Sequence, residues 1–335
     1  MNKVLCFGEL LLRLSPQLDG AWINQASMPV YIGGAELNTA TALARWGIGA
    51  AYCTSLPDHY LATEIVREIE RRGVDSSPVL FAGNRIGTYY LPQGADLKAA
   101  GVIYDRAYSS FSALQPGQID WNTVYEGVTW LHFSAISPAL NQNVAAVCKE
   151  ALIEAGKRNI FISVDMNYRA KLWQYGAAPI HVMPDLVQHC HLIMGNLWAA
   201  EKMLGVDVPA DMADKQEAYL QQAVVSAEEV KKRFPACRQV AYTFRFDRGE
   251  GVEYYAILYD TDLHTSKTHR VEKIVDKVGS GDCFMGGLIY GNLSDLSAQE
   301  TIEFAAAAAV NKLAIKGDAT TASVEDIKKG IPTYA

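Results

Sequence analysis

Short apolar runs alternate with stretches of helical periodicity along most of the chain. The apolar runs predict buried strands, and they cover residues 3–8, 50–56, 129–134, 160–165, 191–195, 239–244 and 253–259. The helical patterns fall mostly between them, near residues 37–46, 60–72, 141–158, 215–234, 283–293 and 299–316. Such alternation is typical of βαβ units that form a mostly parallel sheet. The pattern therefore predicts an α/β fold.

Two stretches break this alternation. Residues 10–33 and 85–110 are strand-like and aromatic, are interrupted by Gly or Pro, and show no helical pattern. If they lie together, they form a small sheet that stands off the main domain as a lid. An apolar face of such a sheet must be covered, so we expect a homo-oligomer, such as a dimer through the lid. Residues 205–234 predict a helical excursion on the periphery.

Composition and charge narrow the class of protein. The chain has 335 residues, of which 50% are hydrophobic and 20% charged, and 30 basic residues against 37 acidic ones give a net charge of −7. This balance argues against a nucleic-acid-binding surface but allows a local basic pocket. No apolar run reaches the roughly 18 residues of a membrane span, and the first residues read as a buried strand rather than a signal peptide. We therefore expect neither nucleic acid nor membrane as a partner.

The cysteine pattern indicates a cytoplasmic protein without a transition-metal site. The six cysteines are scattered and contain no CxxC pair, which favours buried, reduced thiols. His189, Cys190 and His191 could hold a metal, because residues two apart share one face of a strand. They are better explained as the start of the strand near 191–195, so no metal ligand is assigned.

The most informative segment runs from Ile274 to Leu288. It predicts a strand end, a glycine-rich turn at Gly279-Ser280-Gly281, and a helix. Free N–H groups at a helix N-terminus bind anions, above all phosphate. Asp282 in this turn could accept a proton from a hydroxyl that attacks a phosphoryl group, or it could simply cap the helix. Phe284 breaks a dinucleotide fingerprint, and no P-loop motif exists.

Polar residues in three other places could bind an acidic sugar. Asn38 lies one turn after Gly33-Gly34, a pair that would let a ligand approach the backbone, although a plain loop-to-helix turn explains it equally well. Arg169 follows the end of the strand at 160–165, where ligand sites of α/β proteins lie. Tyr104 and Arg106 belong to the second lid segment. Arginine binds carboxylate through its planar donor fork, but each arginine alone could equally be a solvated surface residue.

Two motifs together resemble the signatures of the PfkB (ribokinase-like) carbohydrate kinases. One is the GSGD turn at 279–282, and the other is the GGAELNTA segment at 33–40 that continues to Arg45-Trp46-Gly47. The resemblance implies a three-layer α/β/α kinase domain over 1–335 with a small β-sheet lid. It implies that Asp282 is the catalytic base and that Gly279, Ser280, Gly281 and Asp282 form the anion hole. ATP and Mg²⁺ are implied as well, and the need for a monovalent cation stays open.

Further segments resemble the sugar-acid kinases of this family that act on 2-keto-3-deoxygluconate. They are Gly87-Thr88-Tyr89, the Tyr-x-Arg of 104–106, residues 132–140 and residues 165–173. The resemblance implies ATP-dependent phosphorylation of the keto acid to its 6-phosphate. The substrate-binding residues that it implies are Gly34, Asn38, Tyr89, Tyr104, Arg106, Arg169 and Asp282. A fructokinase or another neutral-sugar kinase is the alternative, and a non-catalytic sugar-acid-binding protein on the same scaffold is a further one.

The nucleotide side departs from the family pattern. Lys277 replaces a small residue, and Ala199 stands where the motif that begins at Asn196 has Glu, with Glu201 two places on. The Gly-x-x-Gly phosphate loop is replaced by residues 243–251, where Arg245 could substitute a charge for glycine backbone contacts. The nucleotide-binding residues that we expect are Asn196, Thr243, Arg245, Gly279 and Gly281.

Overall fold

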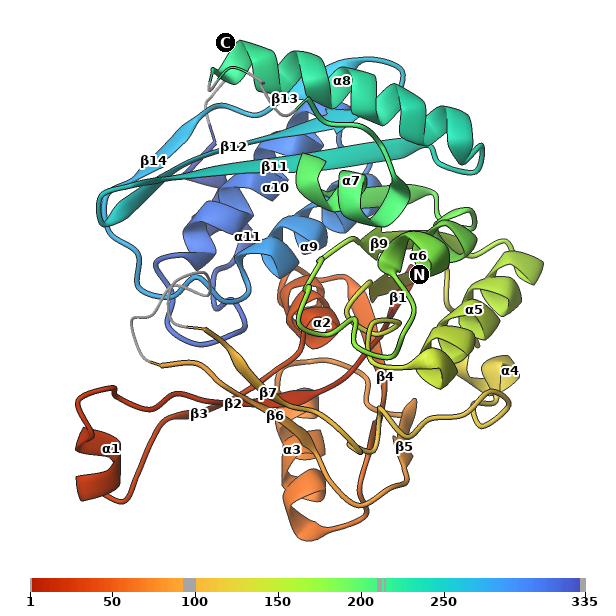
Figure 1. Ribbon diagram of the computed structural model, residues 1–335, viewed down its shortest axis with the longest axis vertical. Helices are drawn as coiled ribbons and strands as arrows, with labels where there is room; N and C mark the ends of the chain where they lie inside the picture. The colour runs from red at the N-terminus through yellow and green to blue at the C-terminus, as the bar shows by residue number, and fades with distance from the viewer. Residues whose placement is uncertain (1, 93–100, 210–212, 214, 332–335) are drawn as a thin grey trace.

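A large, mostly parallel sheet forms the centre of the molecule in this computed structural model, which describes residues 2–92, 101–209, 213 and 215–331 (Figure 1). Its parallel strands are, in spatial order, β11 (Gln239–Arg248), β10 (Leu192–Gly195), β9 (Phe161–Asp165), β8 (Trp130–Ser134), β1 (Lys3–Phe7), β4 (Gly49–Leu56) and β5 (Val79–Phe81). The antiparallel strands β12 (Gly251–Tyr259), β13 (Leu263–Thr265) and β14 (His269–Val271) extend it beyond β11.

Helices cover both faces of this sheet, so the expected three layers are present. One face carries α2 (Ala35–Arg45), α3 (Tyr60–Arg71), α9 (Ser280–Leu293) and α10 (Ala298–Lys312), with α11 (Val324–Lys328) packed on α10. The other carries α4 (Trp121–Val124), α5 (Gln142–Lys157), α6 (Pro179–Val187), α7 (Leu197–Leu204) and α8 (Gln216–Arg233). Strand β1 is buried on both sides: Leu5 and Phe7 enter one core, and Val4 and Cys6 enter the other. This explains its unbroken apolar sequence.

A second, smaller sheet stands off the main body toward the lower left of the view, above α3 (Figure 1). Its strands are β3 (Val30–Gly33), β2 (Leu11–Leu14), β6 (Gly87–Tyr90) and β7 (Ile103–Asp105), in that order. They come from the two stretches expected to form a lid, 10–33 and 85–110, of which residues 93–100 lie outside the described residues. The expectation that neither stretch contains a helix is wrong for Ala21–Asn24, which form the short helix α1 beyond β2 and β3.

The two faces of the small sheet differ in chemistry. Strand register places Val30, Leu14, Tyr90 and Ile103 in one row across all four strands. The neighbouring row is Tyr31, Arg13, Tyr89 and Tyr104. Because side chains alternate along a strand, the two rows face opposite ways. Arg13 and Tyr89 are buried toward the main domain, whereas Val30 and Ile103 are 52% and 64% exposed.

Two expectations about the periphery are corrected. Helix α8, within the segment 205–234, is part of the helical layer and not an excursion. Its residues Ala223, Ala227 and Val230 are fully buried in the core between this layer and the sheet. Residues 210–212 and 214 of the segment lie outside the described residues. Residues 245–248, expected in a loop after the strand at 239–244, continue strand β11, which pairs with β12 up to Arg248 opposite Gly251. In the described residues, no helix combines the length and apolar character needed to cross a bilayer.

Candidate active site

A cavity of about 1120 Å³ opens between the small sheet and the carboxyl ends of the parallel strands. Ligand sites of open α/β sheets lie at this edge. The residues singled out from the sequence all line it, namely Gly34, Asn38, Tyr89, Tyr104, Arg106, Arg169, Asn196, Thr243, Arg245, Gly279, Ser280, Gly281 and Asp282. Segments more than 200 residues apart in the sequence therefore meet around one space.

The glycine-rich turn forms the start of α9. Gly279 is the N-cap with φ 84°, a left-handed conformation that favours glycine, and a Cβ there would overlap the carbonyl oxygen of Asp318. Beside Gly281, by contrast, there is open space. The N–H groups of the first helical turn have no acceptor within a helix. They meet the cavity at Ser280, Gly281 and Asp282, and together with the helix dipole they make an anion site.

Asp282 lies at this anion site with its carboxyl group almost buried. It is 8% exposed, and its Oδ2 accepts a hydrogen bond of 2.7 Å from Nδ2 of Asn38. Burial raises the pKa of Asp282 to about 8, while the Asn38 bond opposes this shift. A carboxyl group that titrates near neutral pH is suited to accept a proton from a hydroxyl group.

Asn38 leaves one polar atom free beside Asp282. Among the described residues its buried Oδ1 has no hydrogen-bond partner, and the residue lines the cavity. A buried acceptor without a partner is costly, so a ligand hydroxyl that donates to it would complete its bonding. Gly34 also lines the cavity. Its φ is 131° and a Cβ there would overlap the carbonyl oxygen of Glu9, so the fold itself also requires glycine at this position.

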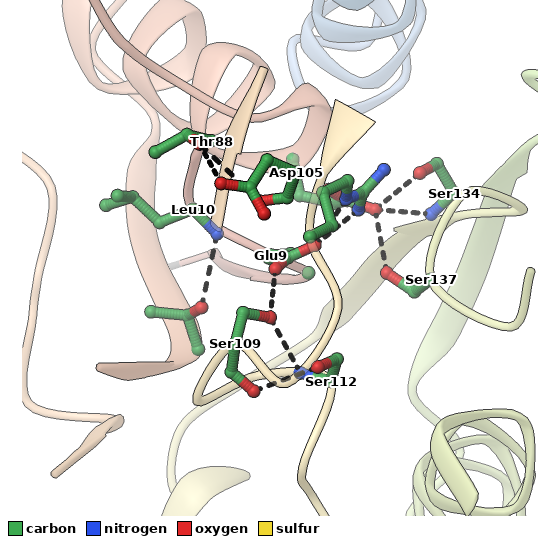
Figure 2. A network of polar contacts seen from close by, with 12 residues as sticks. Glu9, Leu10, Thr88, Asp105, Ser109, Ser112, Ser134 and Ser137 are labelled. Atoms are coloured by element: carbon green, nitrogen blue, oxygen red, sulfur yellow. Dashed lines mark hydrogen bonds and ion pairs between the residues drawn. The ribbon is translucent and has the colours of Figure 1, made fainter. Parts of the chain in front are cut away.

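The two arginines expected to bind a carboxylate differ in how far they are already paired. Arg106 is 5% exposed, and its Nε and Nη2 lie 2.6 and 2.5 Å from Oε2 of Glu9. Glu9 also accepts from the Ser109 hydroxyl in the polar network that Figure 2 shows. Arg169 is exposed in the cavity, where its Nη1 donates to the carbonyl of Tyr168. Arg169 is thus the more open cation of the two.

The aromatic residues of the lid contribute to the wall of the cavity. Tyr89 donates its hydroxyl to Oδ2 of Asp318 at 3.1 Å, and its ring lies 6.4 Å from that of Tyr104. Leu11 and Tyr89 form a small apolar cluster against which Val278 packs. The lid therefore touches the residue that directly precedes the glycine-rich turn.

Three of the expected nucleotide-side residues, Asn196, Thr243 and Arg245, line the cavity from the start of α7 and from β11. Asn196 caps α7, its Oδ1 accepting from the N–H of Ala199 at 2.8 Å. Thr243 donates to the carbonyl of Gly195 at 3.4 Å, which ties β11 to β10. Lys277 reaches the cavity and lies 3.3 Å from Oδ1 of Asp247.

Two carboxylates of the cavity were not predicted from the sequence. Asp165 ends strand β9, and burial raises its pKa to about 6. Its place at the end of a parallel strand was a usable signal. Asp318 lies in a turn after α10 that carries no motif, and Arg13 reaches it at 2.7 Å from the small sheet. Nothing local in the sequence indicates this contact.

Of the residues considered for a metal, His191 already has partners within the fold. Nδ1 of His191 accepts from the N–H of Ile162 at 2.9 Å, and the ring stacks on Phe161. All six cysteines are buried and free. The described part of the chain contains no group of three His, Cys, Asp or Glu that could hold a metal ion.

Comparison with known proteins agrees with this geometry. The family model of the pfkB family carbohydrate kinases matches residues 1–325, and the chain belongs to this family. It is therefore a phosphotransferase with an alcohol group as acceptor.

Several of the similar proteins are kinases of 2-dehydro-3-deoxy sugar acids. The crystal structure of 2-dehydro-3-deoxygluconokinase from Thermotoga maritima is 35% identical, with a TM-score of 0.88 over 98% of this chain and 99% of that one. A 2-dehydro-3-deoxygalactonokinase of Haloferax volcanii is 26% identical over 98% of this chain and 96% of its own length. A 2-dehydro-3-deoxygluconokinase of Bacillus subtilis is 25% identical over 89% and 85%.

Proposed function

We propose that this kinase transfers the γ-phosphoryl group of ATP to the primary hydroxyl of 2-keto-3-deoxygluconate (2-dehydro-3-deoxygluconate), giving the 6-phosphate. The observation that carries the proposal is the buried Asp282 carboxyl beside the free N–H groups of α9, in one cavity with Arg169 and the lid tyrosines. The names of the relatives support the substrate class.

The proposed mechanism uses the chain's own groups in three ways. Asp282 accepts the proton of the attacking hydroxyl, and Asn38 holds both that carboxyl and the substrate. The N–H groups of residues 279–282 stabilise the negative charge that develops on the phosphoryl group. Gly34, Tyr89, Tyr104, Arg106 and Arg169 bind the sugar acid, with Arg169 facing its carboxylate. Closure of the lid then excludes water, which would compete as acceptor.

The nucleotide would lie toward Asn196, Thr243 and Arg245. Magnesium is usually held by one or two carboxylates together with phosphate oxygens and water. Asp165 and Glu201 line the cavity and fit that donor set. When bound with the nucleotide, the ion would neutralise phosphate charge.

A neutral-sugar kinase is the rival, and one observation favours it. The charge of Arg106 is already balanced by Glu9, which leaves fewer cations for a substrate carboxylate. Release of ADP should therefore be measured with a panel of 2-keto-3-deoxygluconate, its C4 epimer 2-keto-3-deoxygalactonate, gluconate, fructose and ribose. We expect the highest kcat/KM for a keto acid. High activity on fructose with none on either keto acid would refute the sugar-acid assignment.

We also propose that residues 1–335 work as one kinase domain in a cytoplasmic homodimer formed through the lid. The row Val30, Leu14, Tyr90 and Ile103 gives the outer face of the lid an apolar stripe that crosses every strand of the small sheet. Stripes of this kind mark interaction sites, and a second lid offers a matching one.

A further inference from the structure

Lys312 is a fully buried lysine that the mechanism above does not use. It ends α10 with 0% exposure, although lysine is almost never buried without a partner. Its Nζ donates to the carbonyl oxygen of Ile315 at 2.9 Å. Burial lowers the pKa of Lys312, and the nearby carboxylates Asp276 and Asp318 act against that shift.

These groups form a charge cluster on the inner side of the lid. Arg13 lies between the two carboxylates, with Nη2 2.6 Å from Oδ2 of Asp276 and Nε 2.7 Å from Oδ1 of Asp318. Asp276 also accepts from the N–H groups of Val278 and Gly317. Arg13 and Lys312 together supply two positive charges for two carboxylates. Without the ammonium group of Lys312, this cluster would carry a net negative charge.

The cluster lies directly behind the proposed anion hole. A Cβ at Gly279 would overlap the carbonyl oxygen of Asp318 and lie 3.2 Å from Cε of Lys312. One helical turn before Lys312, the carbonyl of Ala309 accepts from the Ser280 hydroxyl at 2.9 Å. An uncompensated negative charge here would oppose the binding of phosphate on the other side of the turn.

We propose that the ammonium group of Lys312 is a built-in monovalent cation that positions and charge-balances the anion hole, so that the enzyme needs no exchangeable monovalent cation. This inference rests on the proposed transfer of phosphate at residues 279–282. Lys312 touches neither substrate nor phosphate, and it acts as a positioning residue through Gly279 and Asp318.

The test compares the native enzyme with Lys312→Ala and Lys312→Met at constant ionic strength, replacing tetramethylammonium chloride by chlorides of K⁺, NH₄⁺, methylammonium or Li⁺. We expect native kcat/KM to change less than about twofold. In both variants it should fall by about 10- to 100-fold, somewhat less than the loss of a direct oxyanion donor. K⁺, NH₄⁺ or methylammonium should restore much of the loss in Lys312→Ala, where space has been opened, and Li⁺ should not.

Leu313→Ala is the matched control, because Leu313 is also fully buried and adjacent but carries no charge. It should lower the melting temperature without making activity depend on the cation. Binding of ATP measured by calorimetry gives a second readout that does not require the correct sugar substrate. Native binding without K⁺, together with weakened and K⁺-restored binding in Lys312→Ala, would support the proposal even if every acceptor in the panel failed.

Two results would overturn it. One is a native enzyme that itself requires K⁺ for ATP binding or turnover. The other is a folded Lys312→Met variant with native kcat/KM and native ATP binding in every salt, because Lys312 would then be only a space-filling side chain.

Discussion

At the scale of single residues, the proposed chemistry depends on the state of one carboxyl group. Asp282→Asn removes the proposed proton acceptor but keeps the size of the side chain and its contact with Asn38. We expect kcat to fall by about 10³-fold, within the range for loss of a general base, while the sugar acid still binds. Measurement of kcat and of sugar-acid binding checks this, and near-native turnover would remove Asp282 as the base.

The same variant should be more stable than the native enzyme at alkaline pH, although its turnover is lower. Because burial raises the pKa of Asp282 to about 8, the folded state holds a proton that the unfolded chain releases near pH 4. The contribution of this group to stability is therefore lost as pH rises from about 4 to about 8. Asp282→Asn should melt at a higher temperature than the native enzyme at pH 8.5, which also shows that lost turnover is not lost folding.

Asn38 should set the pH dependence of the reaction. Its amide donates to the ionised form of Asp282 and so lowers the pKa of that carboxyl. In Asn38→Ala the acid limb of kcat/KM should move to higher pH, and activity at pH 7 should drop about tenfold or more, the equivalent of one hydrogen bond to a charged group. Thr39→Val is the control, because Thr39 bonds the backbone carbonyl of Asp282 and not its carboxyl. A shift in the control equal to that of Asn38→Ala would contradict the argument.

At this scale the sequence reveals the residues that lie in motifs and misses those joined only by the fold. The role proposed for residues 279–282 could be predicted because the turn, the donors and the carboxyl group are consecutive in the sequence. Arg13 and Asp276 are 263 positions apart, and Asp318 follows no strand, so no local pattern could bring them together. The Glu9–Arg106 pair was missed for the same reason.

At the scale of elements, α2 depends on a buried acid at its start. Oε1 of Glu36 accepts from the N–H and the hydroxyl of Ser134, at 2.9 and 2.5 Å, and so fixes the first turn of α2 to the end of β8. Glu36→Ala leaves these donors unpaired in a cavity and should cost about 3 kcal/mol of unfolding free energy.

Glu36→Gln provides the matched comparison for that loss. Burial raises the pKa of Glu36 to about 7, so the neutral form is already populated near neutral pH and a neutral amide should be tolerated. We expect a loss of about 1 kcal/mol or less, measured by urea unfolding at pH 7. Equal losses in the two variants would mean that the hydrogen bonds to Ser134 do not stabilise this joint.

The elements themselves were predictable where their pattern was unambiguous. The parallel strands can be predicted from apolar runs in the sequence, because both of their faces are buried. The end of β11 cannot be predicted in this way, because three of residues 245–248 are charged (Arg245, Asp247 and Arg248) and Gly249 follows, a composition that resembles a loop. The packing of helix α8 is hard to predict because three of its four buried positions are the small residues Ala223, Ser226 and Ala227, within a polar sequence.

At the scale of the whole molecule, a negatively charged chain has to bind anions. The net charge of −7 opposes the approach of a sugar acid and of ATP. The cavity lining holds five cations against four carboxylates, and the N-terminus of α9 adds partial positive charge; the cations are Arg106, Arg169, Lys171, Arg245 and Lys277 and the carboxylates Asp165, Glu201, Asp282 and Asp318. Attraction to an anion must therefore be local, and closure of the lid, as proposed, would strengthen it by lowering the local dielectric.

The outer face of the lid provides the last prediction. A glutamate in place of Ile103 would bury a charge in the apolar row Val30, Leu14, Tyr90 and Ile103 if two lids pack together. The dissociation constant of the dimer, measured by sedimentation, should be at least about tenfold higher for this variant than for the native chain. The KM of the variant for the sugar acid should also be higher, because a free lid closes less often. Val225→Glu, a similarly exposed position on α8, should change neither. A native chain that sediments as a monomer at every concentration would remove the lid dimer, and the apolar row would then need another partner.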